Sequence, residues 1–185
     1  ENAYSPDRFR TRTYGGAGRY DVDTLVDDVP SGEGFQYSTK WTVATAATDT
    51  GTYGYSIEQI LEGYDCSHLD YGTASAKKVT LSFWVKVSEA GTYCTGLRQS
   101  GVLHSIHKEL TLSANTWTRV EETFDGLTLD LSGLSGDALT NGSGLIIYLL
   151  VLDAMNNKIS STVGTCEVGN YIATSNQTDW MATAG

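Results

Sequence analysis

The sequence predicts an all-β protein, a two-sheet antiparallel sandwich, on the evidence of its composition and its periodicity. Its 185 residues include 20 Gly against two Pro, with Thr and Ser throughout, which is typical of many short strands joined by tight turns. About eight to ten segments alternate apolar and polar residues with period two, and none sustains the 3.6-residue period of a helix. This length suits one sandwich, so we expect a single domain over residues 1–185.

The N-terminal part is expected to hold a hairpin and a third strand. Residues 8–14 alternate Thr with aromatic character, and the glycine-rich residues 15–18 supply a turn into a returning strand at 19–22. An acidic stretch with Pro30 favours a loop, after which period-two patterning resumes over 37–45.

The middle and C-terminal parts carry the clearest strand patterns. The segment from Tyr55 to Glu62 predicts a strand with one apolar and one polar face, and 79–87 and 104–124 alternate more strictly. Residues 145–152 (LIIYLLVL) are apolar on both faces, which predicts a central strand covered on both sides. The side chains expected in the core are Leu81, Phe83, Val85, Leu110, Leu112, Ile147, Leu149 and Val151.

Charge and cysteine usage exclude several classes of partner. A formal net charge of −10 repels nucleic-acid phosphates and anionic lipid, so neither nucleic acid nor a membrane is an expected partner. The apolar run 145–152 is far shorter than the ~20 residues that cross a bilayer, and the first residues do not resemble a secretory signal. Cys66, Cys94 and Cys166 are odd in number and lack CxxC spacing, so we expect neither an internal disulfide nor zinc.

No catalytic motif is visible, so we expect no enzyme. The sequence contains no GxSxG, HExxH, GxxxxGK[ST] or GxGxxG pattern. His104 and His107 are three residues apart, which on a strand places them on opposite faces, where they cannot bind one metal together. Carboxylate pairs such as Glu58 with Glu62 could in principle serve a glycosidase, but solvated surface acids explain them as well.

Two sets of residues remain as candidates for binding. The stretch DVDTLVDD offers hard oxygen ligands of the kind that calcium prefers, and solvated loop acids are the favoured alternative; the acids are Asp21, Asp23, Asp27 and Asp28. No other cofactor is expected. Aromatic residues near turns could stack on a sugar ring, and the candidates are Tyr53, Tyr64, Tyr71 and Trp180.

Several segments together resemble a jelly-roll domain of tailed-bacteriophage virion proteins. They are the run from Tyr55 to Tyr93 (YSIEQILEGYDCSHLDYGTASAKKVTLSFWVKVSEAGTY), LTLSANTWTRVEETFDGL from Leu110, and the late NYIATSNQT. The residues that match the recurrent pattern are Glu58, Gln59, Gly63, Tyr64, Gly72, Ala76, Lys77, Ser82, Phe83 and Trp84. The family occurs in tail-fibre, head-decoration and related proteins and has no known catalytic residues.

The resemblance implies a two-sheet antiparallel jelly-roll sandwich, similar to carbohydrate-binding modules. It implies a non-enzymatic virion structural protein, either a capsid decoration or a tail or fibre component, assembled in the host cytoplasm and acting through contacts with other virion proteins. The alternative that it leaves open is a glycan-binding module for attachment to the host surface.

Members of the family usually continue into another apolar strand where this chain stops at residues 181–185. We therefore expect an open sheet edge that a neighbouring chain fills in a homo-oligomer or symmetric assembly. Further contacts are expected at the turns around 15–18 and 125–144.

Overall fold

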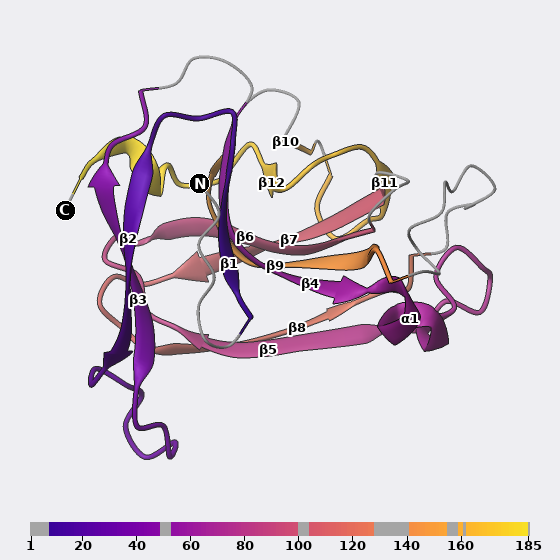
Figure 1. Cartoon of the computed structure of the whole chain (residues 1–185), viewed down its shortest axis with the longest axis horizontal. Coiled ribbons are helices and arrows are strands. Elements are labelled where there is room, and N and C mark those ends of the chain that lie inside the picture. The colour runs from indigo at the N-terminus through magenta and orange to yellow at the C-terminus, as the bar shows by residue number, and fades with distance from the viewer. Residues whose placement is uncertain are drawn as a thin grey trace.

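The computed structural model describes residues 8–48, 53–99, 104–127, 141–154, 159–160 and 162–184. It confirms the all-β fold class, with 54% strand and 7% helix. One large antiparallel sheet forms the middle layer, and three two-stranded sheets surround it (Figure 1).

The large sheet has six strands in the order β1-β4-β9-β6-β7-β11, and each neighbouring pair is antiparallel. Their bounds are β1 Arg10–Tyr14, β4 Gly54–Glu62, β6 Gly91–Gln99, β7 His104–Leu112, β9 Ser143–Ala154 and β11 Glu167–Val168. The apolar strand β9 lies between β4 and β6, which confirms its predicted central position.

The small sheets are β2–β3, β5–β8 and β10–β12, of which only the last is parallel. Their strands are β2 Arg19–Val26, β3 Ser38–Thr45, β5 Val79–Val85, β8 Thr118–Phe124, β10 Ile159–Ser160 and β12 Ala173–Thr174. The helical turns are α1 Gly63–Cys66, η1 Ser67–Leu69 and η3 Trp180–Ala182. β5–β8 lies on one side of the large sheet and β10–β12 on the other (Figure 1).

The predicted hairpin between residues 8–14 and 19–22 is wrong. β1 pairs with β4, and β2 pairs with β3, so the glycine-rich segment at 15–18 carries the chain from one sheet to another. Gly18 is buried against the hydroxyl of Tyr55, to which its N–H donates at 2.8 Å, and a side chain there would meet Tyr55 and Met181. A glycine at position 18 therefore lets the backbone pass close to Tyr55 where the chain crosses from the large sheet to β2–β3.

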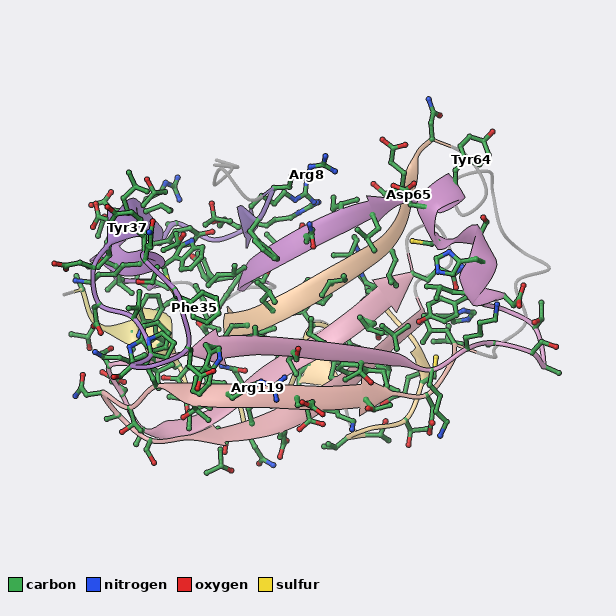
Figure 2. The ribbon with its side chains drawn as sticks, turned by 90° about the horizontal axis from the view of Figure 1, so that it is seen from below. Arg8, Phe35, Tyr37, Tyr64, Asp65 and Arg119 are labelled. Atoms are coloured by element: carbon green, nitrogen blue, oxygen red, sulfur yellow. The ribbon has the colours of Figure 1, made fainter. Side chains whose placement is uncertain are left out.

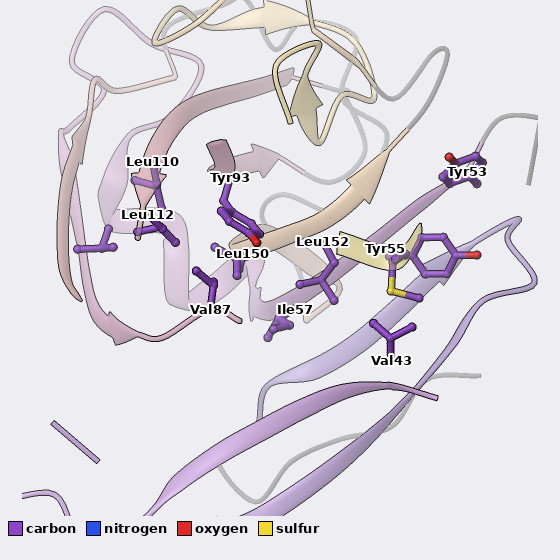
Figure 3. Close-up of a cluster of buried hydrophobic side chains, with 12 residues drawn as sticks. Val43, Tyr53, Tyr55, Ile57, Val87, Tyr93, Leu110, Leu112, Leu150 and Leu152 are labelled. Atoms are coloured by element: carbon purple, nitrogen blue, oxygen red, sulfur yellow. The ribbon is translucent and has the colours of Figure 1, made fainter. Parts of the chain in front are cut away.

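Side chains between the large sheet and β5–β8 form the main core. One cluster centres on Tyr55, Tyr93 and Leu152 (Figure 3), and a second on Leu97 and Phe124. Of the predicted core residues, Leu110, Leu112 and Val151 are buried. The other five are only partly buried, namely Leu81, Phe83, Val85, Ile147 and Leu149. All five lie where the large sheet packs against β5–β8. Because β5–β8 has two strands and the large sheet has six, it covers only part of the sheet and leaves these side chains partly exposed.

The polar face of β4 is also not solvated, contrary to the one-sided pattern that the sequence suggests. Ser56 and Glu58 are both fully buried, and Tyr55 and Ile57 on the other face are also buried. A third apolar cluster, built from Tyr148, Val151, Ile172 and other residues, covers this side of the sheet. β4 is thus buried on both faces.

The C-terminal segment fills a gap between β6 and β9. The two strands pair from Cys94 onward, with a register irregularity between Cys94 and Gly96. There the side chain of Gln177 bridges them: its Oε1 accepts from the N–H of Cys94 at 2.8 Å, and its Nε2 donates to the carbonyl of Val151 at 2.9 Å. A side-chain amide presents the same donor and acceptor as a backbone peptide, so Gln177 continues the ladder where the strands separate.

We expect Gln177→Ala to lower the free energy of unfolding by about 2 kcal/mol, because it leaves a backbone donor and a backbone acceptor without their partners. Urea denaturation of the purified chain measures this change. Asn176→Ala is the matched control, because Asn176 is exposed and its side chain bonds, within the described part of the chain, to Glu109 alone. Its cost should stay below about 1 kcal/mol. Equal costs for the two variants would contradict the bridging role.

Candidate functional site

The four aromatic residues predicted to stack on a ligand do not form one site. Tyr64, on α1, is 64% exposed, and Tyr71 is half-buried after η1. Trp180 is half-buried in η3, where its Nε1 donates to Ser88 at 3.2 Å. α1 and the C-terminal segment lie at opposite ends of the molecule (Figure 1).

The expected exposure of Tyr53 is wrong. It is only 4% exposed, and its ring packs on that of Tyr55 with centroids 5.7 Å apart. Its position near a turn suggested the surface, but it directly precedes β4, whose first residues are all buried. Tyr64 alone of the four presents most of its ring to solvent (Figure 2).

The four acids proposed for calcium are exposed and do not converge. Asp28 accepts hydrogen bonds from Lys86 and, at 3.0 Å, from Trp117, and the hydrogen bond from Lys86 lowers the pKa of its carboxyl. Among the described residues, no three His, Cys, Asp or Glu side chains lie together in a way that could hold a metal ion. The geometry therefore adds no support to the calcium hypothesis. In the described part of the chain, no helix is long and apolar enough to span a membrane.

His104 and His107 lie on opposite faces of β7, as the sequence predicts. The neighbours of His104 on its face are Ile106 and Leu110 in the main core, whereas the ring of His107 lies 6.2 Å from that of Tyr148 on the other side. Both histidines are buried.

The most organised polar group in the described structure is a line of residues across five strands of the large sheet, which we call the polar row. Each member is directly opposite the next in the strand register. In order from β1 to β7 they are Arg10, Glu58, Tyr148, Gly96 and His107. The row lies on the face that carries the apolar cluster of Tyr148, away from β5–β8.

An ion pair anchors one end of the row. Arg10 Nε donates to Glu58 Oε1 at 2.7 Å, and a terminal nitrogen of Arg10 donates to the same oxygen. The other carboxylate oxygen accepts from Tyr14 at 3.3 Å and from Ser56 at 3.4 Å. Arg12 Nη1 lies 3.7 Å from Oε1, so donors on two strands surround the buried charge of Glu58.

The centre of the row is formed by Tyr148, whose hydroxyl accepts from Arg98 Nε at 2.9 Å and lies 3.5 Å from the hydroxyl of Tyr14. Burial raises the pKa of the Tyr148 phenol well above its usual value, so Tyr148 stays protonated at neutral pH.

Gly96 makes room for the ring of His107 at the other end of the row. A Cβ on Gly96 would lie 2.5 Å from Cδ2 of His107 and 2.7 Å from the carbonyl oxygen of Ile106. Burial lowers the pKa of His107 to about 3, so its imidazole is neutral. A ring N–H of His107 donates a hydrogen bond to the backbone of Tyr171, and Nε2 is buried with no hydrogen-bond partner among the described residues.

Every member of the polar row is buried, and the sheet holds its polar groups in fixed positions. The single carboxylate of the row is held by Arg10, and the phenol of Tyr148 and the imidazole of His107 keep one protonation state over the neutral range. What the row offers is a set of fixed hydrogen-bonding groups on a rigid sheet. The two carboxylates considered for a glycosidase are separated in role, because Glu58 is buried and bound by Arg10 whereas Glu62 is exposed.

Comparisons with protein-family models, with curated proteins and with solved structures find no match for this chain. Sequence reasoning missed the polar row because its members come from five separate strands. The alternation of charged and Thr residues in RTRTY was the one local signal, since arginines on alternate positions of a strand share a face.

We expect Glu58→Gln to lower the free energy of unfolding by about 3 to 5 kcal/mol, because it removes the buried carboxylate with which the guanidinium of Arg10 forms an ion pair. Urea denaturation provides the measurement. Glu121→Gln is the control: its pair with Arg119 has both side chains more than half exposed, so the loss should stay below about 1 kcal/mol. A Glu58→Gln variant as stable as this control would contradict the structural role of the pair.

A buried acid outside the polar row predicts a pH dependence of stability. Burial, together with the nearby charge of Asp179, raises the pKa of Asp153 to about 6, against about 3.9 in an unfolded chain. The folded state binds this proton more tightly than the unfolded chain does. The contribution of protonated Asp153 to the free energy of unfolding is therefore fully present below about pH 4, and it is lost as the pH rises through about 6.

Asp153→Asn should remove this loss, because the amide does not titrate. Between about pH 4 and pH 7, the free energy of unfolding of the variant should therefore rise relative to that of the parent by on the order of 2 kcal/mol. Denaturation midpoints at the two pH values measure it. Asp21→Asn, at an exposed site on β2, should follow the parent at both. A constant difference between Asp153→Asn and the parent would refute the assignment.

Proposed function

We propose that this chain is a non-enzymatic jelly-roll domain of a tailed-bacteriophage virion, a capsid decoration or a tail or fibre component that works through protein–protein contacts. The resemblance of its sequence motifs and the layered all-β fold support this role. The observation that carries it is an exposed apolar surface on the β2–β3 hairpin.

The hairpin forms a sheet of its own, and the loop that joins its strands extends beyond β5 at the lower left of Figure 1. Leu25 is 71%, Phe35 51% and Tyr37 53% exposed. Phe35 and Tyr37 lie near one another at one end of the molecule, far from Tyr64 (Figure 2). We call these three residues the hairpin tip.

Backbone geometry turns Leu25 outward. The pairing of β2 with β3 is irregular between Asp23 and Val26, and Leu25 has a φ of 64°. A left-handed conformation costs a non-glycine residue free energy, and a bulge commonly redirects a side chain. An apolar side chain held outward at such a cost fits a surface that another protein covers.

The charge around the hairpin tip defines the partner. Asp27 and Glu33 flank the tip and are exposed, and Asp28 is engaged with Lys86 and Trp117 at its base. We therefore expect a neighbouring virion protein with an apolar pocket and a basic rim. Of the contact turns expected from the sequence, residues 128–140 lie outside the described residues.

A second candidate function, a glycan-binding module for host attachment, is favoured by Tyr64, whose side chain is 64% exposed on α1. An exposed aromatic ring offers a face on which a sugar ring stacks.

The test is incorporation into particles. When the chain and its Leu25→Ser/Phe35→Ser/Tyr37→Ser variant compete for assembly, the variant should be depleted at least about tenfold in purified virions, as measured by mass spectrometry. The control replaces three equally exposed apolar residues elsewhere, Tyr64, Val163 and Val168, by Ser and should be incorporated normally. All six positions are exposed, so thermal unfolding should show little change in either variant.

Equal incorporation of the hairpin variant, or absence of the chain from purified particles, would refute the structural role. Electron microscopy of the particle should place the hairpin tip at an inter-chain contact.

A further inference from the structure

We propose that the outer edge of β5 pairs with the same edge of a second copy of this chain, so that two β5–β8 sheets join across a two-fold axis. The inference goes beyond the proposed virion role, because it assigns an interface between identical chains. It does not use the hairpin tip.

β5 is an edge strand without the usual protection against pairing. Among the described residues it pairs with β8 alone, so alternate backbone N–H and C=O groups along its other edge point away from the sheet. Its sequence, VTLSFWV, contains no charged residue, no Pro and no Gly, and its register with β8 runs without a bulge. Edge strands that stay unpaired usually carry Lys, Pro or a bulge, so β5 has the features of a strand that is paired in its functional state.

The opposite edge of the same small sheet is protected. β8 carries the charged residues Arg119, Glu121 and Glu122. From β7, Lys108 Nζ donates to Glu122 Oε2 at 2.9 Å and lies 5.7 Å from the ring centroid of Phe124. The charges of β8 and its contact with β7 therefore leave β5 as the edge that can accept another strand.

The burial of the inward-facing side chains shows the same asymmetry. On β8, Val120 is 5% and Phe124 0% exposed. The inward-facing side chains of β5 are all partly exposed, and they are Val79, Leu81, Phe83 and Val85. β4 and β9 extend past the β5 edge of the small sheet (Figure 2), and Leu61 on β4 and Ile147 on β9 are also only partly buried. A strand added to β5 would cover apolar side chains as well as pair backbone groups.

The pattern of β5 is self-complementary, which selects a second copy as the partner. An antiparallel pairing of two β5 strands centred on Phe83 sets Leu81 of each copy opposite Val85 of the other. The same pairing sets the two Phe83 side chains opposite one another on the inner face, where aromatic pairs stabilise a sheet. Because a two-fold interface uses the same patch on both copies, it closes as a dimer.

The charges beyond the two ends of β5 favour the same register. Lys77 and Glu89 are both exposed, and each lies six residues from Phe83. The register therefore places Lys77 of each copy opposite Glu89 of the other, and opposite charges across a strand pair are favourable. The present partner of Lys77 is Asp70, in a pair with both side chains about half exposed, so sharing this ammonium costs little.

The experiment is sedimentation of the full chain over a concentration series. The parent chain should be a dimer at about 100 μM and should dissociate on dilution. Ser82→Lys should weaken the dimer about tenfold or more, because the two new ammonium groups lie close together across the two-fold axis. Within one copy, Ser82 is exposed and opposite Glu121, so this variant should melt near the parent temperature.

Thr123→Lys is the matched control, since it adds the same charge to an exposed position on β8, and it should dimerise like the parent. The Leu25→Ser/Phe35→Ser/Tyr37→Ser variant should also dimerise normally. Hydrogen exchange of the parent reports on the edge itself: alternate amides of β5 should become protected as the concentration rises, and the amides of β8 should not change.

A parent chain that stays monomeric over the series would overturn the inference, as would a dimer that Ser82→Lys leaves unchanged. Dimerisation lost in Thr123→Lys would place the interface at β8, and dimerisation lost in the hairpin variant would place it at the hairpin tip. Either result, or a dimer without added protection of the β5 amides, would overturn the assignment to β5.

Discussion

The buried charge of Glu58 is the constraint on which the arrangement of the large sheet depends. A carboxylate removed from water is stable only beside a counter-charge and several donors. β4 alone supplies little more than Ser56, so the guanidinium of Arg10 must come from another strand. This requirement explains why β1 pairs with β4, in a register that sets Arg10 opposite Glu58, and leaves β2 to pair with β3.

The separate β2–β3 hairpin and the polar row both follow from the pairing of β1 with β4. Because β1 belongs to the large sheet, β2 and β3 pair with each other, and the exposed hairpin tip lies outside the large sheet. On the sheet, the anchored carboxylate fixes Tyr14, which reaches the hydroxyl of Tyr148 and, through it, Arg98. The exposed hairpin tip and the buried polar row thus lie on different parts of the fold.

Sequence reasoning succeeded where the signal lay within one strand. The alternation of VTLSFWV and the apolar run of β9 predicted strands that the structure confirms, and the spacing of His104 and His107 predicted their opposite faces. It failed where burial came from elsewhere in the chain. Tyr53 looked like a surface residue next to a turn, and Ser56 and Glu58 looked solvated, because nothing within β4 shows that a second layer covers its polar face.

The sequence by itself determined the all-β class, the location of most strands and the central position of β9, because period-two patterning and side-chain branching act over a few neighbouring residues. Only the tertiary structure decided which strands pair, that Gln177 bridges β6 and β9, and that Arg10, Glu58, Tyr148 and His107 share a row. The contact of Arg10 with Glu58 joins residues 48 positions apart, and that of Arg98 with Tyr148 joins residues 50 positions apart. Their free energy depends on burial and on mutual neutralisation, which arise when the layers close over the sheet.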